Sequence, residues 1–230
     1  DHVVLDRYAH NCCVQGAMAA TRNLHRVRHL STDAFLRQLR RIRATDTDNA
    51  ILVVTEGIFS MDGDSPDLQA LQAACREYEA TLLVDVAHDL GAVGPGGTGS
   101  IGLQGLVGEV DLVIGSFSKV FASNGGFVAT SSAAIREYLR PYAPSHTFSN
   151  ALSPAQCATV LSALEIVRSS EGEALRQNLH GVVQFLRDAL TAHGVVCLGK
   201  PGPLVPVLLG PEGVGRLTAA LCFDRGVFAS

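Results

Sequence analysis

Lysine is almost absent from this sequence. Of its 18 basic side chains, only those at positions 119 and 200 are lysines, and the others are arginines. A guanidinium group stays protonated and its electrons are delocalised, so arginine cannot form an imine. The two lysines are therefore candidates for amine chemistry, and the residues around Lys119 make it the stronger one. An ordinary solvated lysine after a strand is the alternative.

Long apolar runs, excess basic charge and paired cysteine motifs are also missing. No apolar run approaches the ~18 residues that span a bilayer, and no charged and then apolar leader opens the sequence. The net charge of −4 offers no basic patch for nucleic acid or a membrane surface. The six cysteines form no CxxC and no zinc-finger spacing, which is typical of reduced thiols. We therefore expect a soluble, cytoplasmic protein with no membrane span and no nucleic-acid partner.

Polar side chains follow two short apolar runs in the middle of the sequence. Residues 81–84 and 112–114 have the length and composition of buried strands. The polar residues that come after them are Asp85, His88, Ser116, Ser118 and Lys119. In an open parallel sheet the carboxyl ends of the strands face the ligand crevice, so these side chains are expected to converge there.

This set of side chains suits pyridoxal 5'-phosphate (PLP). An amine can form a Schiff base with the PLP aldehyde, and a carboxylate can hold the pyridine nitrogen protonated. Hydroxyl groups can bind the phosphate. The sequence therefore predicts a PLP site between the two strands.

Strand and helix patterns alternate through the first part of the sequence. Expected strands are 2–6, 26–30, 51–55, 81–84, 112–114 and 126–130, and expected helices are 9–21, 32–43, 68–79 and 131–140. A helix between two strands indicates a right-handed βαβ unit with parallel strands. The predicted fold class is therefore α/β, a mostly parallel sheet flanked by helices.

The pattern changes after Pro154. Helices at 154–168 and 171–193 precede weak strands at 195–198 and 204–209, and a last helix covers 214–225. This order is typical of the start of a small α+β domain. We expect a large domain at 1–170 and a small one at 171–230. We also expect the chain to be a fragment, because it opens directly on a strand and stops before a second sheet is complete.

Three other motifs have competing explanations. Residues 94–99, GPGGTG, match the GxGxxG dinucleotide pattern, but no strand leads directly into them, so a tight loop is favoured. Asp62-Gly63-Asp64 could bind a metal ion, although a turn is favoured. Asp85 and His88 could be half of a metal site, but no third ligand has a helpful spacing. No metal site is predicted.

Five stretches of the sequence resemble the α-oxoamine synthases, a family of PLP enzymes with the aspartate-aminotransferase fold, PLP fold type I. In the family's order they are TEGIFSMDGDSPDL, LLVDVAHDLGAVGPGGTG, DLVIGSFSKVFASNGGFVAT, RPYAPSHTFSNALSPAQ and PLVPV. Together they cover most of residues 1–210. The resemblance implies that residues 1–170 form the PLP-binding large domain of this fold.

The resemblance also implies roles for four residues that follow the two central strands. Lys119 would form the Schiff base with the cofactor, and Asp85 would hold the pyridinium nitrogen. His88, in the family's Asp-x-Ala-His motif, would contact the phenolic oxygen of the cofactor or the substrate. Ser116, where the family usually has threonine, would bind the phosphate.

Three further residues are implied around the cofactor ring. The imidazole of His10 would stack on the pyridine face, Ser60 would lie beside the ring, and Glu56 would lie near the site. The family's His-Ala-Ser motif is replaced here by His10-Asn11-Cys12-Cys13. The adjacent cysteines could be reactive, although burial as small hydrophobic residues is the favoured interpretation. His10, His88 and Lys119 are the predicted catalytic residues.

The reaction implied by the resemblance joins an amino acid to an acyl thioester. Loss of carbon dioxide would give an α-amino ketone, with the acyl group carried on coenzyme A or an acyl carrier protein, and with glycine, alanine or serine as the amino acid. A homodimer with shared active sites is also implied, with residues 147–150 near the partner's cofactor. The alternatives are another PLP reaction on the same fold, such as amino transfer or retro-aldol cleavage, or a non-catalytic partner subunit or fragment.

Overall fold

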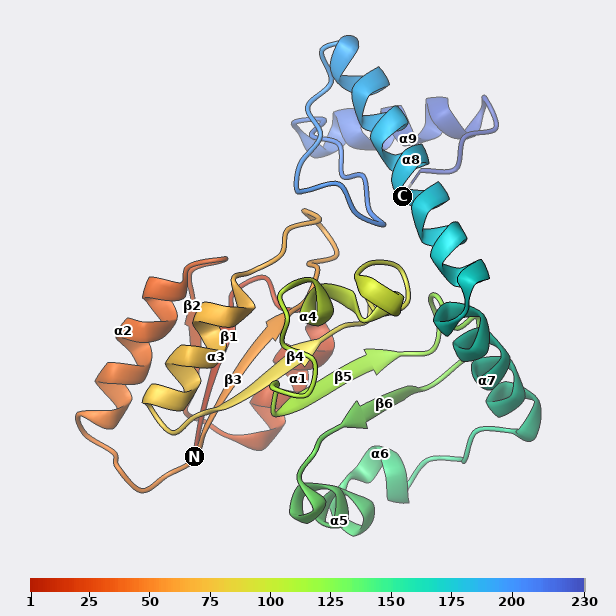
Figure 1. Ribbon diagram of the computed structural model, residues 1–230. Helices are drawn as coiled ribbons and strands as arrows, with labels where there is room; N and C mark the ends of the chain where they lie inside the picture. The colour runs from red at the N-terminus through yellow and green to blue at the C-terminus, as the bar shows by residue number, and fades with distance from the viewer. Residues whose placement is uncertain (230) are drawn as a thin grey trace.

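The computed structural model describes residues 1–229, and a six-stranded sheet organises their first half (Figure 1). Its strands are β1 (His2–Asp6), β2 (Leu24–Val27), β3 (Ile51–Glu56), β4 (Thr81–Asp85), β5 (Leu112–Ser116) and β6 (Gly126–Ala129). They lie in the order β2-β1-β3-β4-β5-β6. The first five strands are parallel and β6 is antiparallel to β5, so the prediction of a mostly parallel sheet is confirmed.

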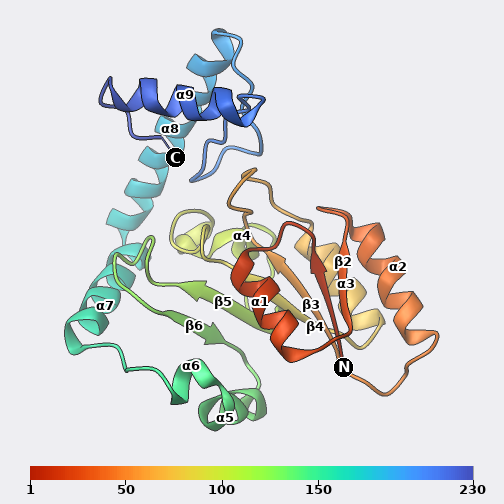
Figure 2. The same cartoon turned by 180° about the vertical axis from the view of Figure 1, so that it is seen from behind.

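Helices cover both faces of the sheet. Two of them, α2 (Thr32–Arg43) and α3 (Leu68–Glu77), lie on one face, and α1 (Asn11–Ala20) lies on the other (Figures 1 and 2). Successive side chains of a strand point to opposite faces. Val53 therefore packs in the core under α2 and α3, while Val54 packs in the core under α1. Both faces of β3 are buried in this way, and its apolar sequence reflects this.

Short polar side chains begin the helices near the predicted positions. Ser31 accepts a hydrogen bond from the backbone N–H of Ala34 at the start of α2, and Asp67 accepts one from Ala70 at the start of α3. Such caps satisfy backbone donors that the first helical turn leaves free. The helices predicted at 32–43 and 68–79 are thereby confirmed, the second ending two residues earlier.

The predicted position of β2 is wrong by two to three residues. The strand covers Leu24–Val27 instead of 26–30. Leu30 adopts a positive φ of 54°, and its N–H donates to Oδ2 of Asp6 at 2.9 Å. This buried carboxylate turns the chain away from the sheet before residue 30, which the local sequence does not disclose.

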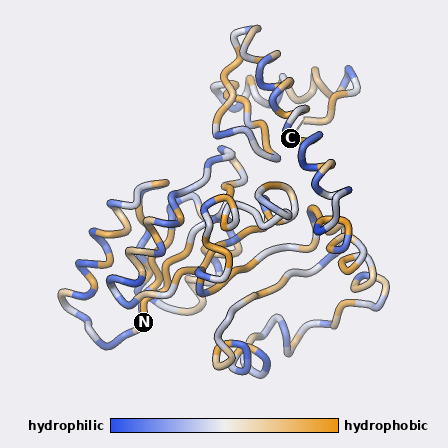
Figure 3. Tube along the Cα trace, viewed as in Figure 1, coloured by the Kyte–Doolittle hydropathy of each residue, from blue (hydrophilic) through white to orange (hydrophobic). Residues whose placement is uncertain are grey.

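A short helix, α4 (Gly99–Leu103), lies between β4 and β5. After β6 the chain is mainly helical, with α5 (Ala133–Tyr142), α6 (Pro144–Thr147), α7 (Pro154–Arg168), α8 (Ser170–Ala192) and α9 (Glu212–Phe223). From the end of α7, α8 leads away from the sheet to the part that carries the C-terminus (Figure 1). Apolar residues gather along the sheet strands, whereas polar and apolar positions alternate along the outer helices (Figure 3). Among residues 1–229, no helix has the length and apolarity needed to cross a membrane.

The strands predicted at 195–198 and 204–209 are wrong. The structure has a single antiparallel bridge there, between Cys197 and Val207. Leu198 N–H donates to the carbonyl of Pro206, and Leu208 N–H donates to that of Val196, both at 2.9 Å. Pro206 has no N–H to return, so the ladder cannot extend into strands.

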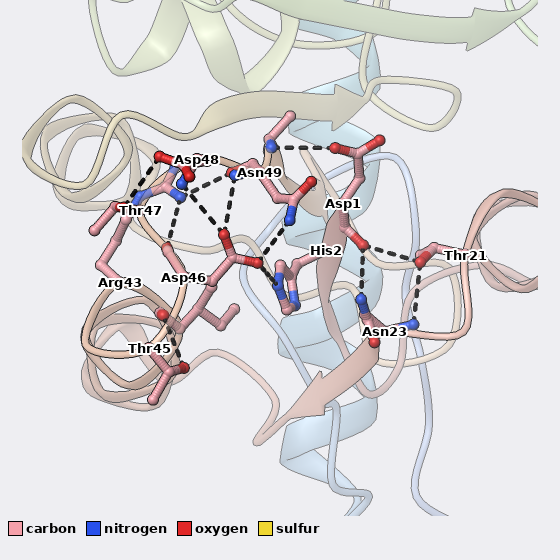
Figure 4. Close-up of polar contacts among 12 residues, drawn as sticks. Asp1, His2, Thr21, Asn23, Arg43, Thr45, Asp46, Thr47, Asp48 and Asn49 are labelled. Carbon is pink, nitrogen blue, oxygen red and sulfur yellow. Dashed lines mark hydrogen bonds and ion pairs between the residues drawn. The ribbon is translucent and has the colours of Figure 1, made fainter.

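A polar network joins the amino-terminal ends of β1 and β3 (Figure 4). The candidate site residues lie at the opposite, carboxyl-terminal ends of the strands. The carbonyl of Asp1 accepts hydrogen bonds from Thr21 and Asn23. The carboxylate of Asp46 accepts from Asn49 and contacts His2, and the Asn49 hydrogen bonds are the main reason that the pKa of Asp46 is lowered. This network fixes the loop between α2 and β3.

Candidate active site

Polar side chains meet where β3, β4 and β5 end. The parallel register pairs Glu56, the last residue of β3, with Asp85, the last residue of β4. It also pairs Asp85 with Ile114, two residues before the end of β5 at Ser116. The predicted gathering of site residues at one edge of the sheet therefore follows from the strand register.

Asp85 is buried at the centre of this edge, with 7% of its surface exposed. Its Oδ1 accepts a hydrogen bond from the backbone N–H of Ala87 at 3.0 Å. Its Oδ2 faces the thiols of Cys12 at 3.9 Å and Cys13 at 3.7 Å. One carboxylate oxygen is thus held by the backbone, and the other is directed at the start of α1.

Glu56 lies beside Asp85 and is also buried. Burial is the main cause that raises the pKa of its carboxyl to about 8. The backbone N–H of His10 donates to Oε1 and opposes this rise, whereas the negative charges of Asp85 and Asp6 add to it. Ser60, half-buried in the following loop, directs its backbone N–H at the same carboxyl. Neutral pH lies below this pKa, so the protonated form of Glu56 prevails there.

Two histidines border the same space from different elements. His10 precedes α1, where its Nδ1 accepts a hydrogen bond from the backbone N–H of Cys12 at 3.2 Å. His88 follows β4 and is half-buried. Its pKa is lowered by burial, then by the charge of Lys119 and, more weakly, His10, while Asp85 opposes the shift. His88 therefore lies within electrostatic range of three other candidate site residues.

Lys119 is presented by a tight loop after β5. Ala122, with a positive φ of 48°, donates its N–H to the carbonyl of Lys119 at 3.0 Å. The backbone N–H of Phe117 donates to the carbonyl of Gly125 and closes the loop. Before the lysine, the hydroxyls of Ser116 and Ser118 lie 2.6 Å apart. The amine is exposed and the two hydroxyls lie next to it along the chain, as the spacing of these residues predicts.

Cys12 and Cys13 are the site residues that sequence reasoning missed. The predicted burial is confirmed for Cys13, whose surface is 8% exposed, but it is wrong for Cys12, which is exposed. Their contact with Asp85 spans more than 70 residues of sequence. The available signal was their position directly after His10-Asn11, where the resembled family has serine and an apolar residue.

Two of the three motifs with competing explanations form turns. Residues 94–99 contain a short 3-10 turn, in which Gly94 has a positive φ of 81° and a Cβ on it would lie 2.5 Å from the carbonyl oxygen of Gly99, so that both features favour glycine. Around Asp62 to Asp64, the N–H of Gly63 donates to the carbonyl of Phe59. Neither turn has the strand-to-helix setting of a nucleotide loop.

The fold and the site together define a class of protein: an α/β domain in which a lysine, a buried carboxylate, imidazoles and paired hydroxyls follow the carboxyl ends of parallel strands. Comparison with known sequences identifies the family. The chain belongs to the aminotransferase class I and II family, whose pattern matches residues 1–228. Within it, the similar proteins are α-oxoamine synthases, as the sequence motifs indicate.

Two relatives and one solved structure illustrate the similarity. The 8-amino-7-oxononanoate synthase of Geobacter metallireducens is 37% identical over 229 residues, covering 100% of this chain and 58% of the relative. A serine palmitoyltransferase of Sphingobacterium spiritivorum is 34% identical over 230 residues, covering 100% of this chain and 56% of the relative. The structure of a serine palmitoyltransferase variant from S. paucimobilis with a bound PLP–myriocin aldimine has a TM-score of 0.93 at 28% identity, covering 100% and 58%. The chain therefore spans a little more than half the length of these proteins.

Proposed function

We propose that the protein containing this chain joins a small amino acid to an acyl thioester, with loss of carbon dioxide, and releases an α-amino ketone. The observation that carries this proposal is the meeting of Asp85, His88 and Lys119 at the ends of β4 and β5. The names of the similar proteins support it, because both 8-amino-7-oxononanoate synthase and serine palmitoyltransferase are acyl-transferring synthases.

PLP is the cofactor that this set of residues fits. A buried carboxylate such as Asp85 suits a protonated pyridine nitrogen, and the Ser116–Ser118 pair offers two hydroxyls for a phosphate. When bound, PLP supplies an electron sink for the carbanion at the α-carbon of the amino acid. Lys119 provides the amine that bonds to the PLP aldehyde.

The chain's own residues then position the reactants and move protons. Lys119 would carry the α-proton of the amino acid as a general base. His88, whose pKa is lowered, favours its neutral form and would accept or donate one hydrogen bond to the cofactor oxygen or the substrate. His10, at the start of α1, would lie on the face of the cofactor ring, and Glu56 and Ser60 would lie beside it.

We also propose that the protein is a cytoplasmic homodimer. Its six cysteines are free thiols in the structure, which suits a reducing compartment. Helices α5 and α6 bury none of their residues among those that the structure describes, and α5 carries apolar residues along one side. Phe148, directly after α6, is 90% exposed. A second copy of the chain packing on this surface would cover these apolar side chains.

The scarcity of lysine makes the cofactor assignment easy to test. We expect PLP added to the purified protein to give a visible absorption band, and borohydride reduction to leave a phosphopyridoxyl group on Lys119. Lys119→Ala should abolish both signals. Lys200→Ala removes the other lysine of the chain and is the matched control, expected to keep them.

A label on Lys200, or an unchanged band in Lys119→Ala, would contradict the proposed site. The reaction type is tested separately with an acyl-CoA and each of glycine, alanine and serine. Release of both free CoA and carbon dioxide supports condensation. Formation of a keto acid would instead indicate amino transfer, and formation of an aldehyde would indicate retro-aldol cleavage.

A further inference from the structure

Three donor atoms at the start of α1 form a nearly regular triangle. The thiols of Cys12 and Cys13 are 4.0 Å apart, and they lie 3.9 and 3.7 Å from Oδ2 of Asp85. Adjacent helical residues normally point in different directions. Here both sulfurs instead face the same carboxylate oxygen, which belongs to a strand that is distant in sequence.

These distances match one face of a tetrahedral metal site. Bonds of ~2.3 Å from a metal ion to two sulfurs, at a tetrahedral angle, place the sulfurs ~3.8 Å apart, and shorter metal–oxygen bonds bring sulfur and oxygen slightly closer. The donor atoms of Cys12, Cys13 and Asp85 therefore need to move by only a few tenths of an ångström to bind one ion together.

The fourth position of such a site faces the exposed side of the triangle. Nδ1 of His10 is 3.0 Å from the thiol of Cys12, but its lone pair accepts the backbone N–H of the same residue and is therefore not a ligand of the ion. His10 and Cys12 are exposed, while Cys13 and Asp85 are buried. The set thus has a rigid, buried half and a half that solvent can reach, which gives an ion a route of entry.

We propose that Cys12, Cys13 and Asp85 bind a thiophilic divalent ion such as Zn²⁺ or Cd²⁺, with solvent at the fourth position. Two sulfurs and one carboxylate oxygen form a donor set that favours these ions over Mg²⁺ or Ca²⁺.

The binding step is balanced in charge. Two S–H bonds break, two metal–sulfur bonds form, and two protons leave to the buffer. Because a doubly charged ion replaces two protons, the net charge of the buried site does not change. This avoids the cost of adding an uncompensated charge next to Asp85 and Glu56.

Occupancy by the ion excludes the cofactor, an inference that rests on the proposed function. Asp85 is the carboxylate assigned to the pyridine nitrogen of PLP. An ion that holds Asp85 removes this carboxylate from the cofactor. Cys12 and Cys13, which stand where the resembled family has serine and an apolar residue, would therefore make cofactor loading sensitive to soft metals.

The test begins with the reduced protein in the absence of PLP. Titration with Cd²⁺ should give a sulfur-to-cadmium charge-transfer band that saturates at one ion per chain, with two protons released. Cys12→Ser and Cys13→Ala should each lower the affinity for Cd²⁺ at least ~10-fold. Mutating residues that only support metal ligands already lowers affinity by about 10–100-fold, and loss of a ligand itself should cost no less. Cys157→Ser, at an exposed position on α7, is the matched control and should change nothing.

Two results would overturn the inference: no saturable band, or a band of equal intensity in Cys12→Ser and in the parent protein. Cys12 is exposed, so its serine variant is expected to fold, and circular dichroism checks this. Competition is then measured as loss of the PLP absorption band on addition of Zn²⁺. That loss should require Cys12.

The outcomes separate this inference from the proposed function. Cadmium binding without PLP binding would support the metal site and contradict the cofactor assignment. PLP binding without cadmium binding would do the reverse. Simultaneous binding of both at full occupancy would contradict the mutual exclusion.

Discussion

Glu56 shows how burial alters a single residue at the end of a strand. Its neighbours Asp85 and Asp6 are also acidic, and all three carboxyl groups are buried. Burial is the main cause of its raised pKa, and the two acidic neighbours add to it. The site thus gathers three buried carboxyl groups, of which Glu56 favours its protonated form and Asp6 contacts Nδ1 of His29 at 2.8 Å.

This residue leads to a prediction about pH. Between the ordinary value of 4.5 and the folded value of about 8, the native state keeps a proton on Glu56 that the unfolded state releases. The stabilising contribution of the protonated group is therefore full below pH 4.5 and is lost as pH rises through 8, a change of about 5 kcal/mol. We expect Glu56→Gln, which cannot ionise, to flatten the fall in unfolding free energy between pH 5 and pH 9.

Denaturant unfolding at several pH values measures this effect. Glu165→Gln changes an exposed glutamate and is the control, expected to keep the parent profile. Equal pH slopes for the parent protein and Glu56→Gln would show that Glu56 ionises normally in the folded state.

At the scale of elements, a buried acid in the turn after β4 packs directly against the start of the loop after β3. Asp89, in the turn after β4, is fully buried and accepts the backbone N–H of Ser100 at 2.7 Å. Gly57 directly follows β3, and a Cβ on it would lie 2.2 Å from Oδ2 of Asp89. Close approach of the two loops therefore requires glycine at position 57.

We expect Gly57→Ala to lower the free energy of unfolding by about 1–3 kcal/mol, because Asp89 must move and weaken its hydrogen bond to Ser100. Gly181→Ala is the matched control in the middle of α8. A Cβ there meets nothing within 4 Å in the part of the chain that the structure describes, and alanine favours a helix by up to about 1 kcal/mol. Opposite signs in thermal or chemical unfolding support this account; a stable Gly57→Ala protein would refute it.

The element boundaries show where local patterns are sufficient. α2 and α3 begin where a capping side chain precedes an amphipathic sequence, and both were predicted to within two residues. The bounds of β2 were not predicted correctly, because Asp6 redirects the chain at Leu30. The segments around Cys197 and Val207 were wrongly predicted as strands, because Pro206 lacks the N–H that would extend their single bridge. Long-range contacts and missing donors override weak strand propensity.

For the whole molecule, the proposed homodimer predicts a dependence on the surface of α5 and α6. The rings of Tyr138 and Tyr142 contact each other there, tilted by 31° with their centroids 4.7 Å apart, and both residues are exposed, as is Phe148. Aromatic residues of this kind often dominate interface energies, each by about 2 kcal/mol or more. Phe148→Asp should therefore weaken dimerisation at least ~10-fold.

Analytical ultracentrifugation across a concentration series measures this change. Phe185→Asp, at an exposed site on α8, is the control and should leave the association unchanged. A parent protein that stays monomeric, or a Phe148→Asp protein that dimerises normally, would contradict the proposed interface. The domain boundary at residue 170 stays a prediction, to be tested by limited proteolysis.

The sequence by itself determined the alternation of strands and helices, the order of the motifs and the candidate site residues. These depend on hydrophobic periodicity, on capping residues and on polar residues directly after buried strands, all of which are local. Lys119 and Asp85 could be found because each follows a short apolar run, and because lysine is otherwise so rare.

Only the tertiary structure decided which residues from distant segments share an environment. The antiparallel direction of β6, the burial that raises the pKa of Glu56, and the contact of Cys12 and Cys13 with Asp85 all depend on how α1, β3 and the later strands pack. Burial and electrostatic coupling are properties of the three-dimensional neighbourhood. Residues more than 70 positions apart acquire them together only when the sheet has formed.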